Sequence, residues 1–455
     1  MFLNIKRLHM VGIGGAGMCG IAEILLNLNF KVTGSDLKLS PITDNLVAMG
    51  AVIYEGHNAS NIGDAEVIVY SSAVDKDNPE VAEAIRRGLP VIRRAEMLGE
   101  LMRMKSGIGI AGTHGKTTTT SMIGHLLTIA GLDPTVIVGG KVKSFEANAK
   151  LGRGEYIVVE ACEFDRSFLS LSPVIAIITN IEAEHMDVYA NFQDVKQSFV
   201  QFANRVPFYG RVIVCLDDAG IQDILPGIDK SVRTYGLNPQ ANYMATEIKC
   251  NGFSTKYRVL YNNNNDLGFF ELSIPGIHNV LNSLASIAIA NELNIPMKIV
   301  AKALKTFPGV HRRFEKIGTF GNNILMDDYA HHPTEIKATL NAVRQYWQGK
   351  LTCIFQPHLY SRTKDFKEEF AKSFHLANEL IVTDIYPARE EPIPSINGKM
   401  VADLAKAFGH RNSHYIGKFE DIVKYLEKER SVEKIVLTIG AGNVNKICQI
   451  LSEMD

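Results

Sequence analysis

Cysteine is scarce in this sequence and follows no pattern. Among 455 residues there are six cysteines and one tryptophan. No two cysteines have the CxxC spacing of a zinc or redox site, and their scatter does not suggest a disulfide framework. We expect them to be reduced and mostly buried. They are Cys19, Cys162, Cys215, Cys250, Cys353 and Cys448.

Excess charge and long apolar runs are missing as well. The chain has 48 Lys and Arg against 49 Asp and Glu, so its charge gives no reason to expect nucleic acid or an anionic membrane as a partner. No uninterrupted apolar run reaches the roughly 18 residues that span a bilayer. Residues 1–15 lack the apolar stretch and cleavage site of a signal peptide. These absences favour a cytoplasmic protein without membrane insertion.

What the sequence does contain is a repeated alternation of short β-branched runs with helical stretches. This alternation is typical of parallel sheets covered by helices. The expected strands are 8–11, 31–33, 67–70, 107–111, 156–159, 174–179, 351–355, 380–383 and 435–439, with one more beginning at Ile324. The expected helices include 17–28, 79–87, 117–130 and 278–293. The pattern therefore predicts an α/β protein.

The length indicates about three domains, at roughly 100 to 200 residues each. We place them at 1–105, 106–311 and 312–455. The first and last are expected to be Rossmann-like, and the middle one to be an ATPase-type domain with a mostly parallel sheet. Between Tyr243 and Ile274 the pattern changes to alternating strands around the turn Asn262–Asp266. This change predicts a small β-hairpin region on the middle domain.

A glycine-rich loop follows the strand 107–111 and opens a helix. Backbone N–H groups in such a loop surround phosphates, while Lys116 reaches the β/γ oxygens and the Thr117 hydroxyl binds Mg²⁺. The loop departs from the strict GxxxxGK[ST] spacing, because Ile110 stands five residues before Gly115. The alternative is a glycine-rich structural turn. The loop comprises Gly112, Thr113, His114, Gly115, Lys116, Thr117 and Thr118.

A second glycine-rich loop follows the first strand. A GxGxxG pattern with a later acid, here Asp36, allows close backbone approach to a diphosphate. Alone it leaves three interpretations open: an NAD site, a UDP-sugar site, or a structural turn. The loop comprises Gly12, Ile13, Gly14, Gly15, Ala16 and Gly17.

Two further candidates come just after strands of the middle domain, at the edge where α/β sheets bind ligands. Glu160 offers the oxygen that Mg²⁺ prefers. His185 is a less expected magnesium ligand, and a hydrogen-bonding role for it is equally open.

Polar groups are also dense near the start of the third domain. Asp327, Asp328, Tyr329, His331 and His332 precede Pro333, which suits the first position of a helix. Such density favours a site over a solvated turn. Further back, Asn279 and Asn282 lie three residues apart at a helix start, where Asn279 has the alternative role of a helix cap.

Taken together, these stretches resemble the Mur ligase family over essentially the whole chain. The motifs GIGGAGM with GSD, AGTHGKTTT, VEACEFD, TNIEAEHMD, GIHNVLN, HRRFE and DDYAHHPTE occur in the family's order. The resemblance implies three domains that bind a UDP-sugar, ATP and an amino acid. It implies ATP-dependent joining of L-alanine to the lactyl carboxylate of UDP-N-acetylmuramate through an acyl phosphate, giving ADP and phosphate for peptidoglycan precursor synthesis.

The resemblance also assigns residues to roles. ATP would be bound by residues 112–118 with Asn279, Asn282 and Arg313, and the metal by Thr117, Glu160 and His185. The UDP-sugar would be bound by Gly12, Gly14, Gly15, Ala16, Gly17, Ser35, Asp36, Ser71 and Ser72. The amino acid would be bound by Tyr329, His331 and Arg362. The catalytic set would be Lys116, Arg313, Asp328 and His331, with His331 accepting the amine proton.

Two positions depart from the family pattern. Several relatives carry a carbamylated lysine about fifteen residues after the histidine, where this chain has Phe199 and Val200, so a second metal would have to be held differently. Many close relatives have an arginine where this chain has Leu359, which leaves more of the anion binding to Arg362.

Three rival functions stay open at this point. One is another Mur-family ligase that recycles a tripeptide or adds a later amino acid. The second is an NAD-dependent oxidoreductase, for which a second phosphate loop has no use. The third is a non-catalytic nucleotide-binding module, which the combination of Glu160, His185 and Arg313 disfavours. Whether the protein is a monomer or a dimer is left open.

Overall fold

The structure is a computed structural model that describes residues 5–71, 73–75, 77–143, 147–184, 188–388 and 390–455. The chain divides into two units. The first comprises Met1–Ile248, Tyr257–Glu271 and Val280–Pro308, and the second comprises Lys249–Lys256, Leu272–Asn279 and Gly309–Asp455. Each unit is described by itself. The boundaries near 105 and 311 stay predictions.

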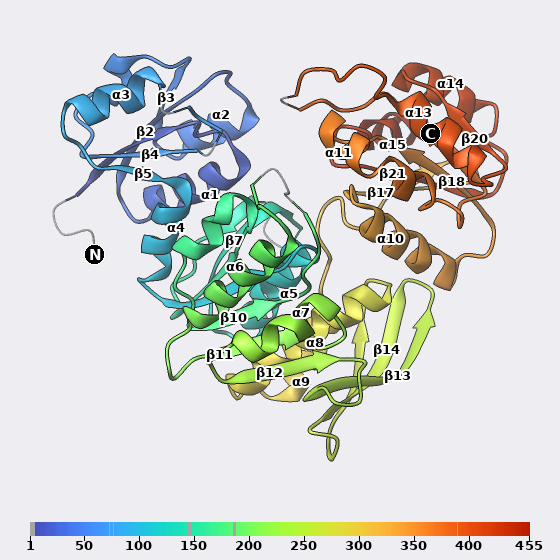
Figure 1. Ribbon diagram of the computed structural model, residues 1–455, viewed down its shortest axis with the longest axis horizontal. Helices are drawn as coiled ribbons and strands as arrows, with labels where there is room; N and C mark the ends of the chain where they lie inside the picture. Colours follow the sequence, from blue (N-terminus) through green and yellow to red (C-terminus); the bar gives the residue numbers. More distant parts are fainter. Residues whose placement is uncertain (1–4, 72, 76, 144–146, 185–187, 389) are drawn as a thin grey trace. The chain divides into compact units, whose positions relative to one another are not determined.

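The first unit begins with a five-stranded parallel sheet in the order β3-β2-β1-β4-β5 (Figure 1). Its strands are β1 Arg7–Val11, β2 Lys31–Asp36, β3 Val52–Glu55, β4 Val67–Tyr70 and β5 Val91–Arg93. The connecting helices are α1 Ala16–Asn27, α2 Pro41–Ala48, α3 Pro79–Arg86 and α4 Arg94–Met102. Local sequence sets where α2 and α3 begin, since Ser40 and Asn78 cap them and a proline follows each cap. This order, reversing at β1, is that of a Rossmann-like half.

A ten-stranded sheet follows, in the order β15-β14-β13-β12-β11-β10-β6-β9-β7-β8. Its strands are β6 Ser106–Ala111, β7 Thr135–Val142, β8 Ala147–Lys150, β9 Tyr156–Glu160, β10 Ile175–Ile178, β11 Arg211–Cys215, β12 Val232–Gly236, β13 Tyr243–Asn251, β14 Ser254–Tyr261 and β15 Asn265–Leu272. Its helices are α5 Lys116–Ile129, α6 Phe192–Asn204, α7 Ala219–Ile224, α8 Ile277–Glu292 and α9 Met297–Lys305. Strands β9, β6, β10, β11 and β12 run parallel, as expected for a phosphate-binding domain.

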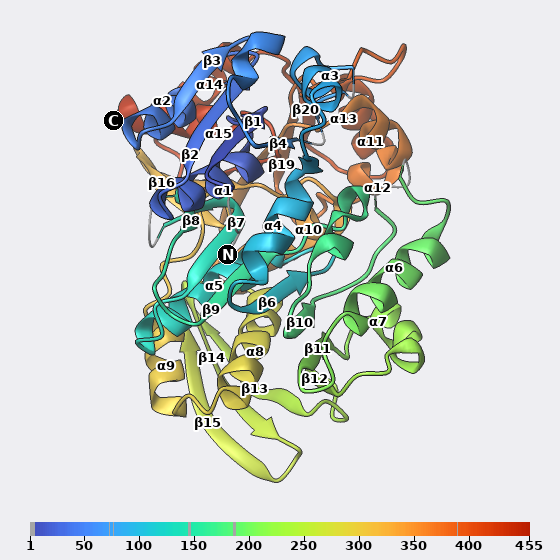
Figure 2. The same cartoon turned by 90° about the vertical axis from the view of Figure 1, so that its left-hand side faces the viewer.

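The β-hairpin region is present but larger than predicted. It contains three strands rather than two, and β13 pairs with β12, so that they extend the main sheet (Figure 2). Alternating polarity identifies strands, but it does not specify which sheet edge they join. A second antiparallel pair, β7 with β8, was not predicted. Two glycines, Gly139 and Gly140, interrupt the β-branched run of β7 and weaken its strand signal.

The second unit carries a six-stranded sheet in the order β16-β17-β21-β18-β19-β20, parallel except for β16 with β17. Its strands are β16 Glu315–Phe320, β17 Asn323–Asp328, β18 Lys350–Phe355, β19 Glu379–Val382, β20 Ser413–Tyr415 and β21 Lys434–Ile439. Its helices are α10 Pro333–Tyr346, α11 Tyr360–Asp365, α12 Lys367–Ala371, α13 Gly398–Ala407, α14 Phe419–Glu427 and α15 Asn445–Glu453. Neighbouring residues of β18 enter two separate buried clusters, Phe355 one and Ile354 the other. Both faces of this sheet are therefore covered, as in a Rossmann-like fold.

All six cysteines are free, as expected, and four of them are buried. None of the helices in the described part of the chain combines the length and apolar character needed to cross a membrane.

Candidate functional site

The phosphate-loop motif forms the turn between β6 and α5. Gly112 has a φ of +135°, and a Cβ added there would lie 2.0 Å from the Thr179 Oγ1. Gly115 has a φ of +80°, and its Cβ would lie 2.7 Å from the Asn282 Oδ1. Only glycine adopts such backbone angles without strain. The glycines of this motif are therefore required by its geometry, and Asn282 lies directly against the start of α5.

The loop is held by the segment that follows β10. The His114 N–H donates to the Asn180 side chain at 2.7 Å, and the Thr179 hydroxyl donates to the His114 carbonyl at 2.6 Å. Strands β6, β9 and β10 are parallel neighbours, so their carboxyl ends meet at one edge. Our sequence interpretation missed Thr179 and Asn180 as loop supports, although they are the first two residues of the motif TNIEAEHMD.

Lys116 points into this loop. Its ammonium donates to the carbonyls of Gly112 and Thr113, the latter at 2.9 Å, and lies 2.9 Å from both carboxylate oxygens of Glu163. Burial is the largest single influence and lowers the pKa of Lys116, but the neighbouring negative groups, Glu163 first among them, together outweigh it and raise the pKa overall. Lys116 is therefore fully charged at neutral pH. The pairing with Glu163 was not predicted, although that glutamate stands only three residues after Glu160.

Thr117 and Glu160 form an oxygen pair beside Lys116. The Thr117 hydroxyl donates to a Glu160 carboxylate oxygen at 3.1 Å, and the Gly139 N–H donates to the other oxygen at 2.7 Å. Two oxygens at right angles on Mg²⁺, each about 2.1 Å away, are about 3 Å apart, so this pair fits adjacent positions of a magnesium ion. The third predicted ligand, His185, lies outside the described residues.

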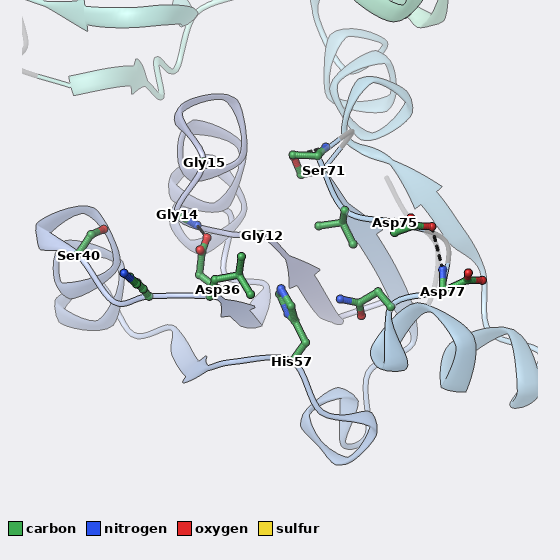
Figure 3. A pocket seen from close by; sticks show the side chains of 14 residues that line it. Gly12, Gly14, Gly15, Asp36, Ser40, His57, Ser71, Asp75 and Asp77 are labelled. Carbon is green, nitrogen blue, oxygen red and sulfur yellow. Dashed lines mark hydrogen bonds between the residues drawn. The ribbon is translucent and has the colours of Figure 1, made fainter. Parts of the chain in front are cut away.

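The N-terminal glycine loop borders a pocket of about 710 Å³. Gly12, Gly14 and Gly15 line it together with Asp36 and Ser71 (Figure 3). The Asp36 carboxylate is turned toward Gly14 and accepts its N–H at 2.8 Å. Five of the residues that were predicted to bind the UDP-sugar therefore line this one pocket. Of the other predicted residues, Ala16 and Gly17 lie in the first turn of α1, and Ser72 lies outside the described residues.

Ser35, also predicted to bind the UDP-sugar, is fully buried beneath this pocket. Its hydroxyl donates to the buried carboxylate of Glu80 and lies 2.9 Å from the Nδ1 of His57, which lines the pocket. Glu80 also accepts from Asn61 at 2.7 Å and faces the buried imidazole of His9 at 3.3 Å. Ser35 therefore supports the pocket wall, and His57 is a pocket residue that our sequence interpretation missed.

This buried network makes Glu80 a source of acid sensitivity. Burial raises the pKa of Glu80, but hydrogen bonds from His9, Ser35 and Asn61 together outweigh burial and lower the pKa to about 2. A carboxylate with a depressed pKa stabilises the fold above its unfolded value near 4.5, and this contribution is lost as the pH falls toward 2.

We therefore expect Glu80→Gln to lower the free energy of unfolding by about 2 kcal/mol at pH 7 and by much less at pH 3. Urea unfolding at the two pH values measures this, with Glu100→Gln on the exposed face of α4 as the control. An equal loss at both pH values would contradict the ionised network.

In the second unit, Tyr329 and His331 lie close together, with ring centroids 5.4 Å apart. The Nδ1 of His331 lies 3.0 Å from the Tyr329 carbonyl and 3.3 Å from Glu335. His358 faces His331 at 6.1 Å and stacks on Tyr386 at 5.7 Å. The rings of His358 and Tyr386 therefore lie next to the residues that were predicted to bind the amino acid substrate. Arg362 lies on α11, which begins two residues after His358.

Asp328 is held by backbone N–H groups, and two arginines flank Tyr329. The Asp328 carboxylate accepts from Phe314 at 2.7 Å and from Ala330 at 2.8 Å. Burial raises the pKa of Asp328 to about 6, with Arg313 and these N–H groups opposing the rise. The guanidinium groups of Arg312 and Arg313 lie 5.0 and 5.2 Å from the ring centre of Tyr329. Asp328 thus fixes the two turns that carry Arg313 and Tyr329.

Four other predicted positions have clear structural settings. Pro333 is the first residue of α10, as expected. Asn279 lies within the first turn of α8 and donates to the Pro275 carbonyl at 2.7 Å, so it does not occupy the cap position before the helix. Phe199 is fully buried against Phe168. Leu359 has a φ of +68°, a strained conformation for a leucine.

Three family models match successive parts of the chain. Residues 7–106 match the Mur ligase family catalytic domain, residues 110–290 the Mur ligase middle domain, and residues 312–442 the Mur ligase glutamate ligase domain. With a phosphate loop and a second glycine-loop pocket in one α/β unit, the geometry agrees with these matches. The chain belongs to the Mur ligase family.

Curated relatives match over nearly the whole length. UDP-N-acetylmuramate–L-alanine ligase of Geobacter sp. (strain M21) is 49% identical, with 98% of this chain and 96% of the relative covered. The enzyme of that name from Solibacter usitatus is 50% identical, with 98% and 94% covered.

Solved structures show the same fold. UDP-N-acetylmuramate-alanine ligase MurC from Thermotoga maritima is 30% identical, with a TM-score of 0.83 and 98% of each chain covered. A murein peptide ligase from Psychrobacter arcticus is 25% identical, with a TM-score of 0.71 and 98% of each chain covered.

Proposed function

We propose that this protein is an ATP-dependent ligase that joins L-alanine to the lactyl carboxylate of UDP-N-acetylmuramate and releases ADP and phosphate. The observation that carries the proposal is the presence of two different phosphate-type sites in one unit: the loop around Lys116 and the pocket behind Gly12, Gly14 and Gly15. The relatives that match over the full chain bear the name of this activity. An oxidoreductase would have no use for the Lys116 loop.

The first unit supplies the groups for phosphoryl transfer. In the proposal, Lys116 and the loop N–H groups hold the phosphates of ATP and neutralise charge as it develops on the γ-phosphoryl group. Thr117 and Glu160 would hold Mg²⁺, which supplies further neutralisation of phosphate charge when bound. A carboxylate is a poor electrophile, so its conversion to an acyl phosphate is the step that ATP makes possible.

The second unit supplies the groups proposed for the amine. Tyr329 and Arg362 would bind the amino acid, and Arg313 would neutralise phosphate charge. The Nδ1 of His331 lies against the Tyr329 carbonyl. A proton on Nδ1 leaves Nε2 as the atom that accepts a proton from the amine. We place the reaction in the cytoplasm, where six free cysteines stay reduced.

The function is tested by ADP release from the purified protein with UDP-N-acetylmuramate and a panel of amino acids. We expect L-alanine to be preferred, with glycine and L-serine as weaker substrates. A pocket for one methyl group discriminates by only about 1 to 3 kcal/mol, so some use of similar amino acids is expected. Much faster turnover with glutamate, a diamino acid or a peptide would overturn the alanine assignment and leave the family unchanged.

The acyl-phosphate step has its own test. With ¹⁸O in the lactyl carboxylate, attack on the γ-phosphorus transfers one labelled oxygen to the inorganic phosphate when the amine displaces it. Attack on the α-phosphorus would place the label in AMP. Lys116 and the Thr117–Glu160 pair suit the β/γ end of the nucleotide, so mass spectrometry is expected to find labelled phosphate. Label in AMP would exclude the mechanism.

A further inference from the structure

Arg94, the first residue of α4, lies beside the last glycine of the N-terminal loop. A Cβ added to Gly17 would lie 2.9 Å from one guanidinium nitrogen of Arg94 and 3.1 Å from its Cδ. Gly17 has no positive φ, so backbone conformation does not explain a glycine there. The glycine leaves space for the Arg94 side chain at the first turn of α1.

The same arginine also lies near the end of β9, where Glu160 stands. Arg94 lines a small cavity together with Glu160 and Cys162. Its helix is fixed against the segment that follows Glu160, because Gly99 of α4 packs so closely on Ser170 that a Cβ would lie 2.4 Å from the Ser170 carbonyl oxygen. Arg94 therefore lies between the first turn of α1 and the proposed metal ligand Glu160.

The guanidinium of Arg94 makes no hydrogen bond or ion pair with any residue that the structure describes, although the residue is partly buried. Arg93, its neighbour, contacts Tyr70 and Asp165 instead. A partly desolvated guanidinium is costly unless an anion pairs with it, and its planar fork suits a carboxylate. The Arg94 guanidinium is therefore suited to bind an anionic ligand.

We infer that Arg94 binds the lactyl carboxylate of the UDP-sugar acid and directs it toward the γ-phosphate of ATP. The inference rests on the proposed function, in which that carboxylate must travel from the pocket behind Gly14 to the phosphates held by Lys116. Arg94 lies beside Gly17 and lines the cavity with Glu160, so it is a cation that the fold places between these two sites. It is a substrate-binding residue and determines the preference for a UDP-sugar that carries a carboxylate.

The test compares two ligands by calorimetric titration of the full-length protein. UDP-N-acetylmuramate carries the carboxylate, and UDP-N-acetylglucosamine has the same nucleotide, diphosphate and amino sugar without it. Arg94→Met should weaken binding of the first by about 10- to 100-fold, the effect of losing a charge-assisted hydrogen bond. Binding of the second, and of a non-hydrolysable ATP analogue, should change less than about twofold.

Two further variants support the comparison. Arg94→Lys keeps the positive charge but loses the planar guanidinium. It should therefore raise KM for UDP-N-acetylmuramate with little change in KM for ATP or L-alanine. If Arg94→Met does not fold, this variant tests the inference in its place. Arg103→Met is the matched control, because Arg103 adjoins the other end of α4 and forms an exposed pair with Glu100 at 2.7 Å.

Equal losses for both UDP-sugars would assign Arg94 to the diphosphate and overturn the inference. A loss confined to the ATP analogue, or no loss with either variant, would overturn it as well. If the unaltered protein binds neither UDP-sugar, the proposed function itself fails, an outcome distinct from failure of the Arg94 assignment.

Discussion

Replacing Lys116 by methionine is expected to reduce turnover at least 100-fold. The ammonium lies inside the phosphate loop, bonded to the Thr113 carbonyl at 2.9 Å, and is fully charged at neutral pH. Removing one preorganised donor at a developing phosphate charge costs about 10²- to 10³-fold in rate. Binding of the UDP-sugar, for which we propose the separate pocket beside Gly12, Gly14 and Gly15, is expected to be unchanged. ADP release and calorimetric titration measure the two quantities.

The same substitution also removes the partner of Glu163, which is only 3% exposed. An isolated buried carboxylate is unfavourable, so Lys116→Met should also lower stability. The double variant Lys116→Met/Glu163→Gln should restore stability while leaving turnover low. Lys399→Ala, which removes an exposed pair with Asp403, serves as the control. If Lys116→Met retained more than a tenth of the activity, Lys116 would have no role at the phosphates.

A large loss of stability is expected when Arg312, rather than its neighbour Arg313, is replaced. The Arg312 guanidinium lies 3.0 Å from the fully buried Asp327 and donates to the carbonyls of Gly440 and Gly442 at 2.7 and 2.8 Å. Removing one partner of a buried ion pair costs about 3 to 5 kcal/mol. Because Arg312 is partly exposed, we expect Arg312→Met to cost about 3 kcal/mol, or roughly 6 to 12 °C in melting temperature.

This loss should depend on pH in a defined direction. Burial raises the pKa of Asp327, and Arg312 and Thr438 offset this only in part. A carboxylate with a raised pKa destabilises the fold above that pKa, and loss of Arg312 raises the pKa further. The destabilisation should therefore shrink as the pH falls from 7 to 5, because protonated Asp327 needs no counter-charge. Thermal unfolding at both pH values measures this.

Arg344→Met is the matched control for Arg312→Met. Arg344 also donates to backbone carbonyls, those of Leu376 and Gly349, but none of the carboxylates in the described residues pairs with it. We expect it to cost less and to show no pH dependence in this range. Addition of Asp327→Asn to Arg312→Met should recover part of the stability. If Arg312→Met were no more harmful than Arg344→Met, the buried ion pair would contribute nothing.

Elements that depend on local pattern could be predicted from the residues alone. Alternating β-branched and helical stretches predicted the parallel sheets that contain β1, β6 and β18, because strand and helix periodicity depend on residues close together in the sequence. Gly112 and Gly115 marked the phosphate loop, since any residue with a side chain would be strained at the backbone angles there. Such features need no knowledge of distant contacts.

Contacts between groups that are far apart in the sequence became known only from the folded chain. It paired Lys116 with Glu163 and placed Ser35 on Glu80 beneath the pocket. It brought His358 to His331, stacked Tyr386 on His358, and set Arg94 against Gly17. It also joined β13 to the edge of the main sheet. These contacts depend on strand order and helix packing, which local residue patterns leave undetermined because equivalent sheet edges and helix faces look alike in sequence.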